Sequence, residues 1–185
     1  MIDLSLIARV EGPNLTLRLI EPEDADYVQN LRTDPTYNRH LSEVRGTVED
    51  QRRWIEGYKA RETEGREFYY VIERKDGTRC GLVRLYDIGA ESFTWGSWIL
   101  DANKPRKAAL ESALLIYRVA FDLIGLRRAE FDVRRDNKCT LLFHRRFGAK
   151  ETHTNEQDVF FIYSRETFEK DQSEFLRIAE QEARV

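Results

Sequence analysis

The middle of the chain contains three β-strand patterns in succession, followed at once by a long helical pattern. Residues 67–73 are an aromatic and β-branched run, residues 80–86 alternate between apolar and polar side chains, and residues 92–100 form a third strand pattern. The turns between them are short, which is typical of antiparallel neighbours. Apolar residues at steps of three and four then predict a helix that ends at Gly125. An antiparallel meander that leads into a helix therefore forms the framework of the chain.

Strand and helix patterns also precede and follow this meander. The alternation of Ile2, Leu4 and Leu6 predicts a strand that pairs with residues 15–19 across a Gly-Pro-Asn turn. The remaining predicted elements are helices over residues 21–32 and from Thr47, a strand over 128–133, a helix over Asn137–Phe147 that Gly148 ends, strands from Ala149 and over Val159–Ser164, and a helix over 165–185. This order predicts a mixed α/β (α+β) fold.

The composition argues against several classes of protein. The 30 Lys and Arg residues are interspersed with 33 Asp and Glu residues, so a broad basic face for nucleic acid is not expected. The chain has neither a continuous apolar run of about 18 residues nor a signal-peptide pattern. Its two cysteines, without a CxxC motif, form neither a disulfide framework nor a zinc ribbon. We expect one cytoplasmic domain over residues 1–185, without nucleic-acid or membrane partners; a homodimer is compatible with the sequence.

The common motifs for phosphate and metal chemistry are missing from the sequence. There is no GxxxxGK[ST] loop and no GxGxxG after a strand. His40, His144 and His153 are scattered, without an HExxH motif, so no metal site is expected. Cys139 and His144 lie on one predicted helix, but about 140° apart around its axis, which argues against a thiolate–imidazole pair.

Two features between the third strand and residue 150 point to a binding site. Lys104, Arg106 and Lys107 precede a helix that opens with small residues, and the free N–H groups of a helix start attract anions. The alternative is a basic loop that only caps the helix. Further along, Asn137 and His144 are seven residues apart, about 20° apart on one helix face.

Together with Phe147-Gly148-Ala149, this pattern resembles the GNAT family of N-acetyltransferases over roughly residues 15–164. The resemblance is to the branch that includes RimJ/RimL-like enzymes and acetyltransferases of amino-sugar nucleotides. It implies a mostly antiparallel, twisted sheet with helices on both faces, split into a V-shaped cleft for acetyl-CoA. The family's pyrophosphate loop, [Q/R]-x-x-G-x-[G/A], corresponds to residues 104–109, where Ala109 fits the last position and Lys107 replaces the first glycine.

The resemblance also implies which residues bind the cofactor and act in catalysis. His144 stands where the family commonly has a tyrosine that protonates the leaving thiolate; an imidazole can do this work, with an ordinary pKa closer to neutral. The alternative is that His144 only packs or binds a backbone carbonyl. The expected acetyl-CoA contacts are Trp98, Ile99, Leu100, Lys104, Arg106, Lys107, Ala108, Ala109, Leu110, Asn137, Phe143 and Arg146.

The acceptor is expected to contact the first two long helices and their connecting loop. The segment LRTDPTYNRHLSEV looks like the acceptor-facing region of the amino-sugar branch. Glu91 and Asp132 are carboxylates near the cleft, but neither is assigned as the general base. The expected acceptor-binding residues are Arg32, Asn38, Arg39, His40, Arg84 and Tyr86.

The resemblance thus predicts an acetyl-CoA-dependent N-acetyltransferase. Its expected acceptor is a small-molecule amine, a nucleotide-linked amino sugar of surface polysaccharide synthesis, which attacks directly in a ternary complex. Two alternatives stay open: a protein N-terminal acetyltransferase of the RimJ/RimL type, and a degenerate domain that binds acyl-CoA without turnover.

Overall fold

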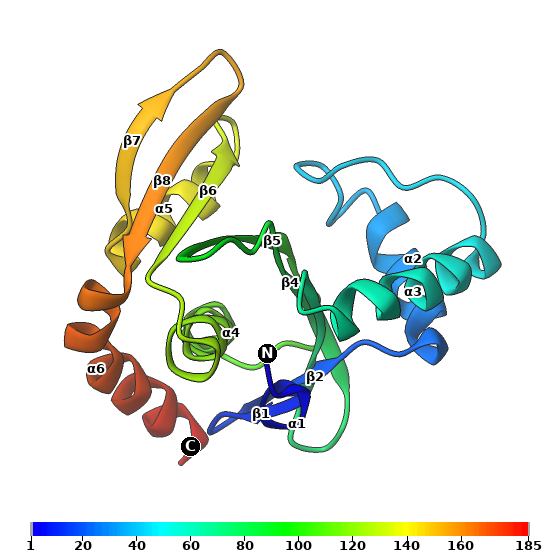
Figure 1. The fold of residues 1–185 in the computed structure, drawn as a ribbon, viewed down its shortest axis with the longest axis horizontal. Coiled ribbons are helices and arrows are strands. Elements are labelled where there is room, and N and C mark those ends of the chain that lie inside the picture. The colour runs from blue at the N-terminus through cyan, green and yellow to red at the C-terminus, as the bar shows by residue number, and fades with distance from the viewer. Residues whose placement is uncertain (1, 185) are drawn as a thin grey trace.

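The computed structural model describes residues 2–184, and its eight strands form a sheet with helices on both faces (Figure 1). The strand order is β1-β2-β3-β4-β5-β6-β8-β7, and only β5 and β6 pair in parallel. This confirms the mixed α/β fold. The strands are β1 (Arg9–Glu11), β2 (Leu15–Leu19), β3 (Phe68–Arg74), β4 (Arg79–Tyr86), β5 (Ser92–Leu100), β6 (Arg128–Arg134), β7 (Lys150–Thr154) and β8 (Asp158–Ser164).

The helices agree with the sequence except at the N-terminus and in the second half of the helix that follows the meander. Residues expected to form the first strand form a short helix instead, because Asp3 caps it by accepting a hydrogen bond from the N–H of Ser5. The helix after the meander changes to π-helical geometry in its second half, and the C-terminal helix, Arg165–Ala183, begins where it was predicted to begin. The helices are α1 (Leu4–Ile7), η1 (Pro22–Asp24), α2 (Ala25–Thr33), α3 (Val48–Thr63), α4 (Ala108–Tyr117), η2 (Arg118–Ile124), α5 (Lys138–Phe147) and α6 (Arg165–Ala183).

Strand β3 is buried on both faces, which explains its nearly continuous apolar sequence. Tyr70 and Ile72 pack into the core cluster that includes residues of α4 and α5, while Tyr69 and Val71 pack into a second cluster with residues of α2 and α3. Successive side chains of a strand point to opposite faces, so one strand serves both clusters. The sheet therefore separates α2 and α3 from the other long helices.

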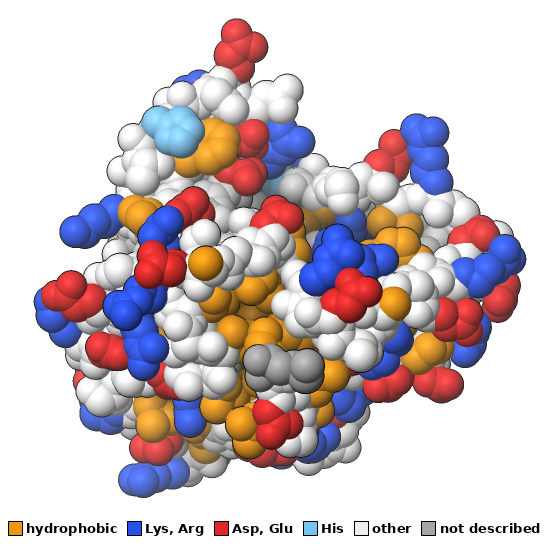
Figure 2. Space-filling view, viewed as in Figure 1, with side chains coloured by type: hydrophobic (Ala, Val, Ile, Leu, Met, Phe, Trp, Pro, Cys, Tyr) orange, Lys and Arg blue, Asp and Glu red, His pale blue; other side chains and the backbone are white. Residues whose placement is uncertain are grey.

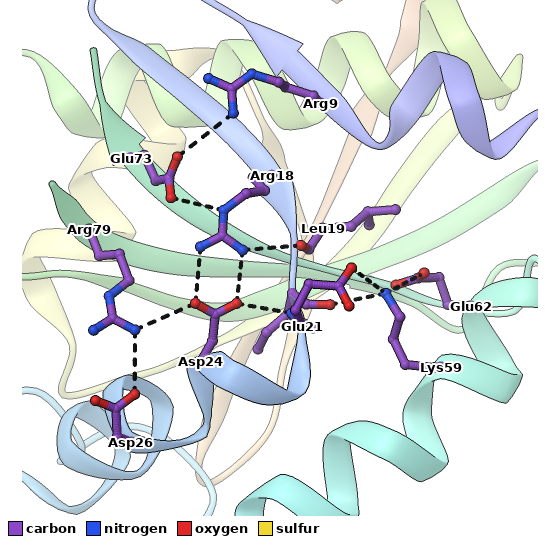
Figure 3. A network of polar contacts seen from close by, with 11 residues as sticks. Arg9, Arg18, Leu19, Glu21, Asp24, Asp26, Lys59, Glu62, Glu73 and Arg79 are labelled. Carbon is purple, nitrogen blue, oxygen red and sulfur yellow. Dashed lines mark hydrogen bonds and ion pairs between the residues drawn. The ribbon is translucent and has the colours of Figure 1, made fainter. Parts of the chain in front are cut away.

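An ion-pair network fixes the start of α2 to the sheet (Figure 3). The guanidinium of Arg18 on β2 donates to both oxygens of Asp24, at 2.8 and 3.0 Å, and also to Glu73 on β3 at 2.8 Å. Burial alone would raise the pKa of Asp24, but Arg18 and the N–H of Glu21 hold it below its usual value. The loop that follows α2 therefore starts from a fixed helix.

The sheet opens between β5 and β6. These strands pair only at Ser92 with Arg128 and at Phe93 with Ala129, and then they separate, as Figure 1 shows. Near the far end of β5 the pairing with β4 shifts, and Ser97 adopts a left-handed conformation with φ of +48°. Such a bulge bends a strand away from regular pairing. The expected V-shaped opening is confirmed.

The surface carries charges of both signs. On the face drawn in Figure 2, Lys and Arg side chains alternate with Asp and Glu side chains around a central hydrophobic strip. Within residues 2–184, no helix combines the length and the apolar character needed to span a membrane.

Candidate active site

A cavity of about 310 Å³ lies where β5 and β6 separate. Strand β5 contributes Trp95 to Trp98, and strand β6 contributes residues 131–134. The other wall holds two side chains of α5, Thr140 and His144, and its N-cap residue Asn137. The loop after α2 covers the cavity with residues 40–42. The lining residues that sequence analysis predicted as functional are His40, Tyr86, Trp98, Asn137 and His144.

His144 is enclosed by aromatic rings and is only 3% exposed. The ring centroid of Phe131 lies 4.5 Å from that of the imidazole, and that of Trp95 lies 5.4 Å away. The Nδ1 atom has no hydrogen-bond partner within residues 2–184. Burial lowers the pKa of His144 to about 3, so the imidazole is neutral at neutral pH. A pKa near neutrality, expected from the residue type, is therefore wrong for the free protein.

The low pKa of His144 predicts a specific loss of stability in mild acid. An unfolded histidine has a pKa of about 6.5, so below that pH the unfolded chain binds a proton that the folded chain excludes. This penalty is absent above about pH 6.5 and grows by about 1.4 kcal/mol per pH unit as the pH falls toward 3. In urea denaturation, the wild type should lose about 2 kcal/mol more than His144→Phe between pH 7.5 and pH 5. Equal losses of unfolding free energy in the two proteins would contradict the low pKa of His144.

Asn137 starts α5 and also lines the cavity. Its side chain accepts a hydrogen bond from the N–H of Thr140 at 3.3 Å, as an N-cap does. Gly148, with φ of +108°, ends the helix in the left-handed conformation that glycine adopts easily. Phe143 packs edge-on against the ring of Trp98 at 5.0 Å. Arg146 is exposed and is not part of the cavity lining.

The basic loop before α4 leads directly into the first turn of that helix. Lys104, Arg106 and Lys107 are exposed, and Lys107 precedes α4 in the left-handed conformation, with φ of +57°. A glycine would adopt this conformation without strain, so lysine keeps the backbone path at a cost of about 1 kcal/mol. The first N–H groups of α4, including those of Ala109 and Leu110, have no acceptor one turn back in the helix. Ala108 itself is buried.

Side chains of β5 diverge in their surroundings. Trp98 lies on the cavity and donates from Nε1 to the Oγ of Ser112 at 3.1 Å, which ties β5 to α4. Ile99 packs into the core cluster with α2 and α3, and Leu100 packs against the opposite cluster. Of these three predicted cofactor contacts, only Trp98 lines the central cavity.

The predicted acceptor residues are divided among neighbouring cavities. His40 and Tyr86 line the central cavity, whereas Arg32 and Arg84 line a second one beside it. Arg39 lies in a third, with Arg134 and Arg135. Asn38 lies in a turn, where its N–H donates to the carbonyl of Asp34 at 3.0 Å.

The loop after α2 reaches across the opening to the end of β6 (Figure 1). His40 Nδ1 lies 3.2 Å from Oδ1 of Asp136, in the turn between β6 and α5. On its other side, Arg32 donates to the carbonyl and the hydroxyl of Ser42 at 3.0 and 2.8 Å. The loop thus contacts both sides of the cleft.

Two carboxylates face the central cavity, and sequence reasoning found only one of them. Asp132 on β6 and Asp158 on β8 both line it. Burial raises the pKa of Asp132, and the charge of Asp158 adds to the increase. Glu91, in contrast, is exposed and pairs with Arg127 and Arg128 at the closed end of the strands. Among the described residues, no group of three or more His, Cys, Asp or Glu side chains is arranged to hold a metal ion.

Asp158 carries no local sequence signal, whereas Ser97 follows Gly96, and a glycine inside a strand often marks a bulge. The pairing of Asp132 with Phe160 places Asp158 diagonally across from Asp132 on the same sheet face, which only the strand register could have revealed. The bulge in β5 brings Ser97 to the lining of the central cavity.

Comparisons with known proteins agree with this geometry. A family model described as an acetyltransferase (GNAT) domain matches residues 14–150. A structure described as apo FdhC, a nucleotide-linked sugar GNAT, aligns with a TM-score of 0.86 and 33% identity, covering 92% of this chain and 98% of that chain. Mycobacterium smegmatis RimJ in complex with CoA-disulfide aligns with a TM-score of 0.78 and 19% identity, covering 92% of each chain.

A curated protein sequence is also similar. The SPbeta prophage-derived uncharacterized N-acetyltransferase YokL of Bacillus subtilis (strain 168) is 23% identical over 139 residues, which is 74% of this chain and 76% of that protein. The family match spans more than half of the chain and includes both walls of the central cavity. The chain therefore belongs to the GNAT family of N-acetyltransferases, enzymes that use acetyl-CoA.

Proposed function

We propose that this enzyme transfers an acetyl group from acetyl-CoA to the amine of a nucleotide-linked amino sugar. The observation that carries the proposal is the central cavity, which brings His144 from α5 and two carboxylates from the opposite strands to one opening in the sheet. The similarity to a protein described as a nucleotide-linked sugar GNAT, at 33% identity, supports this acceptor class.

The residues around the cleft fit acetyl-CoA, which supplies the acetyl group as a thioester when bound. The left-handed Lys107 and the small Ala109 leave backbone N–H groups of α4 open to a diphosphate, and the exposed cations add positive charge. Asn137 and Phe143 would contact the pantetheine arm on the α5 side. The proposed contacts on the β5 side are Trp98, Ile99, Leu100, Lys104, Arg106, Lys107, Ala108, Ala109 and Leu110.

The carboxylates suit the amine. Asp132 attracts an ammonium group into the cavity, whereas Arg134 lies 3.6 Å from Asp158 and partly balances the charge of that carboxylate. An amine must lose a proton before it can attack a carbonyl carbon. Because burial raises the pKa of Asp132, its carboxylate binds a proton more readily than that of a solvent-exposed aspartate. We assign Asp132 this role.

His144 and the β5 backbone would act on the other side of the reaction. Backbone N–H groups near the β5 bulge stabilise the developing oxyanion. The neutral imidazole of His144 offers one N–H that can donate a hydrogen bond to the leaving sulfur and stabilise the negative charge that develops there, and coenzyme A leaves as a thiolate that takes a proton from solvent. Burial among aromatic rings keeps the imidazole from binding a proton before the substrates arrive.

A protein N-terminal amine is the second candidate acceptor, because the acidic lining of the cavity would also attract a peptide ammonium group. The buried Arg32 beside the cavity favours an anionic acceptor instead. The sugar nucleotide therefore remains the first choice.

A thiol-release assay with a panel of amines tests the function. We expect release of coenzyme A with nucleotide-linked amino sugars, and much slower release with the free amino sugars and with peptides that have a free N-terminus. Calorimetric titration with acetyl-CoA, coenzyme A and dephospho-coenzyme A checks the cofactor site in the same samples. Release with peptides alone would favour the second candidate, and binding without any release would indicate a domain that has lost turnover.

A further inference from the structure

A second cavity, of about 360 Å³, lies beside the central one on the α2 and α3 side of the sheet. Residues 42–45 of the loop after α2 cover it, and Ser42 lines both cavities. Its size falls within the range of about 300–1,000 Å³ that is common for small-ligand pockets. An acceptor long enough could therefore occupy both.

Arg32 in this second cavity is a buried cation without a protein counterion. The residue is 8% exposed, and within residues 2–184 no carboxylate oxygen lies within 4.0 Å of its guanidinium. Its hydrogen bonds go to neutral oxygens, on Ser42 and on Ser97. A buried charge is costly unless it is paired, which indicates that an anion from outside the chain completes this site.

Polar atoms beside Arg32 are also unpaired. Neither Nε of Arg32 nor the hydroxyl of Tyr69 has a hydrogen-bond partner among the described residues. Tyr69 is 2% exposed, and burial raises the pKa of its hydroxyl, an increase that nearby Arg32 partly offsets. The phenol therefore stays protonated and can donate a hydrogen bond to an anion.

The rest of the cavity lining carries charges of both signs and an apolar wall: Arg45 lies 3.1 Å from Glu43, Asp50 caps the start of α3, and Arg84 adds a positive charge. Arg84 and Arg61 share the single carboxylate of Glu67, so this trio has a net positive charge. Burial alone would raise the pKa of Glu67, but the two arginines hold it below its usual value, which keeps the carboxylate ionised. Trp54 lines the same cavity and is 38% exposed, which gives a ligand ring or sugar an apolar surface.

We infer that the second cavity binds the phosphate groups of the acceptor, with Arg32 as their counterion and Tyr69 as a second donor. The identity of the anion rests on the proposed function. Arg32 also donates from Nη1 to the Oγ of Ser97 at 3.3 Å, in the bulge of β5 that lines the central cavity. A phosphate held by Arg32 thus lies one side chain away from the strand beside which the amine reacts.

Calorimetric titration with nucleoside diphosphates tests this site directly. Uridine diphosphate and thymidine diphosphate are titrated in saturating coenzyme A, so that the cofactor's own diphosphate site is filled. The wild type should bind both diphosphates, and uridine and thymidine much more weakly. Arg32→Gln should weaken diphosphate binding at least about tenfold, because it removes the cation that pairs with the phosphate.

Three further variants separate binding from folding. Tyr69→Phe removes a hydroxyl that has no partner in the free protein, so it should weaken diphosphate binding without lowering the melting temperature. Arg32→Lys should restore part of the affinity. Arg53→Gln removes an exposed positive charge from α3 and should leave binding unchanged.

The outcomes also separate this inference from the proposed function. Absence of diphosphate binding to the wild type would overturn the inference. Binding by Arg32→Gln and Tyr69→Phe as tight as that of the wild type would also overturn it. Diphosphate binding that depends on Arg32 supports the inference even if no sugar nucleotide is acetylated, and in that case the proposed reaction alone fails.

Discussion

His144→Phe is expected to lower the turnover of acetyl transfer about 100-fold and to leave acetyl-CoA binding unchanged. The substitution keeps an aromatic ring inside a cage of aromatic rings, but it removes the N–H that faces the reaction in the proposed mechanism. A positioned hydrogen-bond donor to developing negative charge contributes about 10²–10³-fold, and we take the lower end because a neutral imidazole N–H stabilises the sulfur without transferring its proton. Steady-state thiol release gives turnover, and calorimetry gives cofactor affinity.

Two comparison variants sharpen this experiment. His144→Gln retains an N–H but has no ring nitrogen to exchange protons, so it should retain more turnover than Phe if the role is hydrogen bonding alone. His153→Phe is the matched control, since that exposed imidazole on β7 stacks on Phe160, away from the central cavity. Unchanged turnover in His144→Phe would remove His144 from the mechanism.

The sequence predicts a strand or helix well where the pattern within that one element is sufficient to identify it. The strands β3, β4 and β5 are confirmed because short turns and side-chain alternation are local properties. Helix α5 is also confirmed, since Asn137 caps its start and Gly148 ends it. The N-terminal strand is wrong because Ile2, Leu4 and Leu6 alternate over too few residues to distinguish a strand from one helical turn.

The site depends on contacts between distant segments, and for that reason it is less predictable. The low pKa of His144 comes from burial by rings on β5, β6, β8 and its own helix, which no spacing within α5 encodes. Asp158 enters the cavity through the register of β8 with β6. At Lys107 the residue type alone is misleading. A lysine argues against a left-handed backbone, but the structure has one at this position.

Glu111→Ala is expected to cost about 3–5 kcal/mol of the free energy of unfolding, the largest stability effect that we predict. Glu111 on α4 is fully buried, and its Oε1 accepts hydrogen bonds from the N–H groups of Asn14 and Leu15, each at 2.8 Å. Its Oε2 accepts another from the side-chain amide of Asn14. Alanine leaves these buried donors without an acceptor. Each donor that water cannot reach then costs about 1–3 kcal/mol of the free energy of unfolding.

Urea denaturation and thermal melting measure this loss, which should lower the melting temperature by roughly 10 °C. Glu111→Gln should cost less, because its carbonyl oxygen can still accept from both backbone N–H groups while its amide faces the amide of Asn14. Glu180→Ala removes an exposed carboxylate from α6 and serves as the control.

The position of Glu111 connects this stability effect to the cofactor site. Its own N–H donates to the carbonyl of Lys107 at 2.9 Å, so the same residue joins the turn before β2 to the first turn of α4. Partial loosening of that turn should weaken acetyl-CoA binding in Glu111→Gln even at temperatures where the variant remains folded. If the variant binds acetyl-CoA as tightly as the wild type while its unfolding free energy falls, the start of α4 is held in place by Trp98 and Ser112 instead.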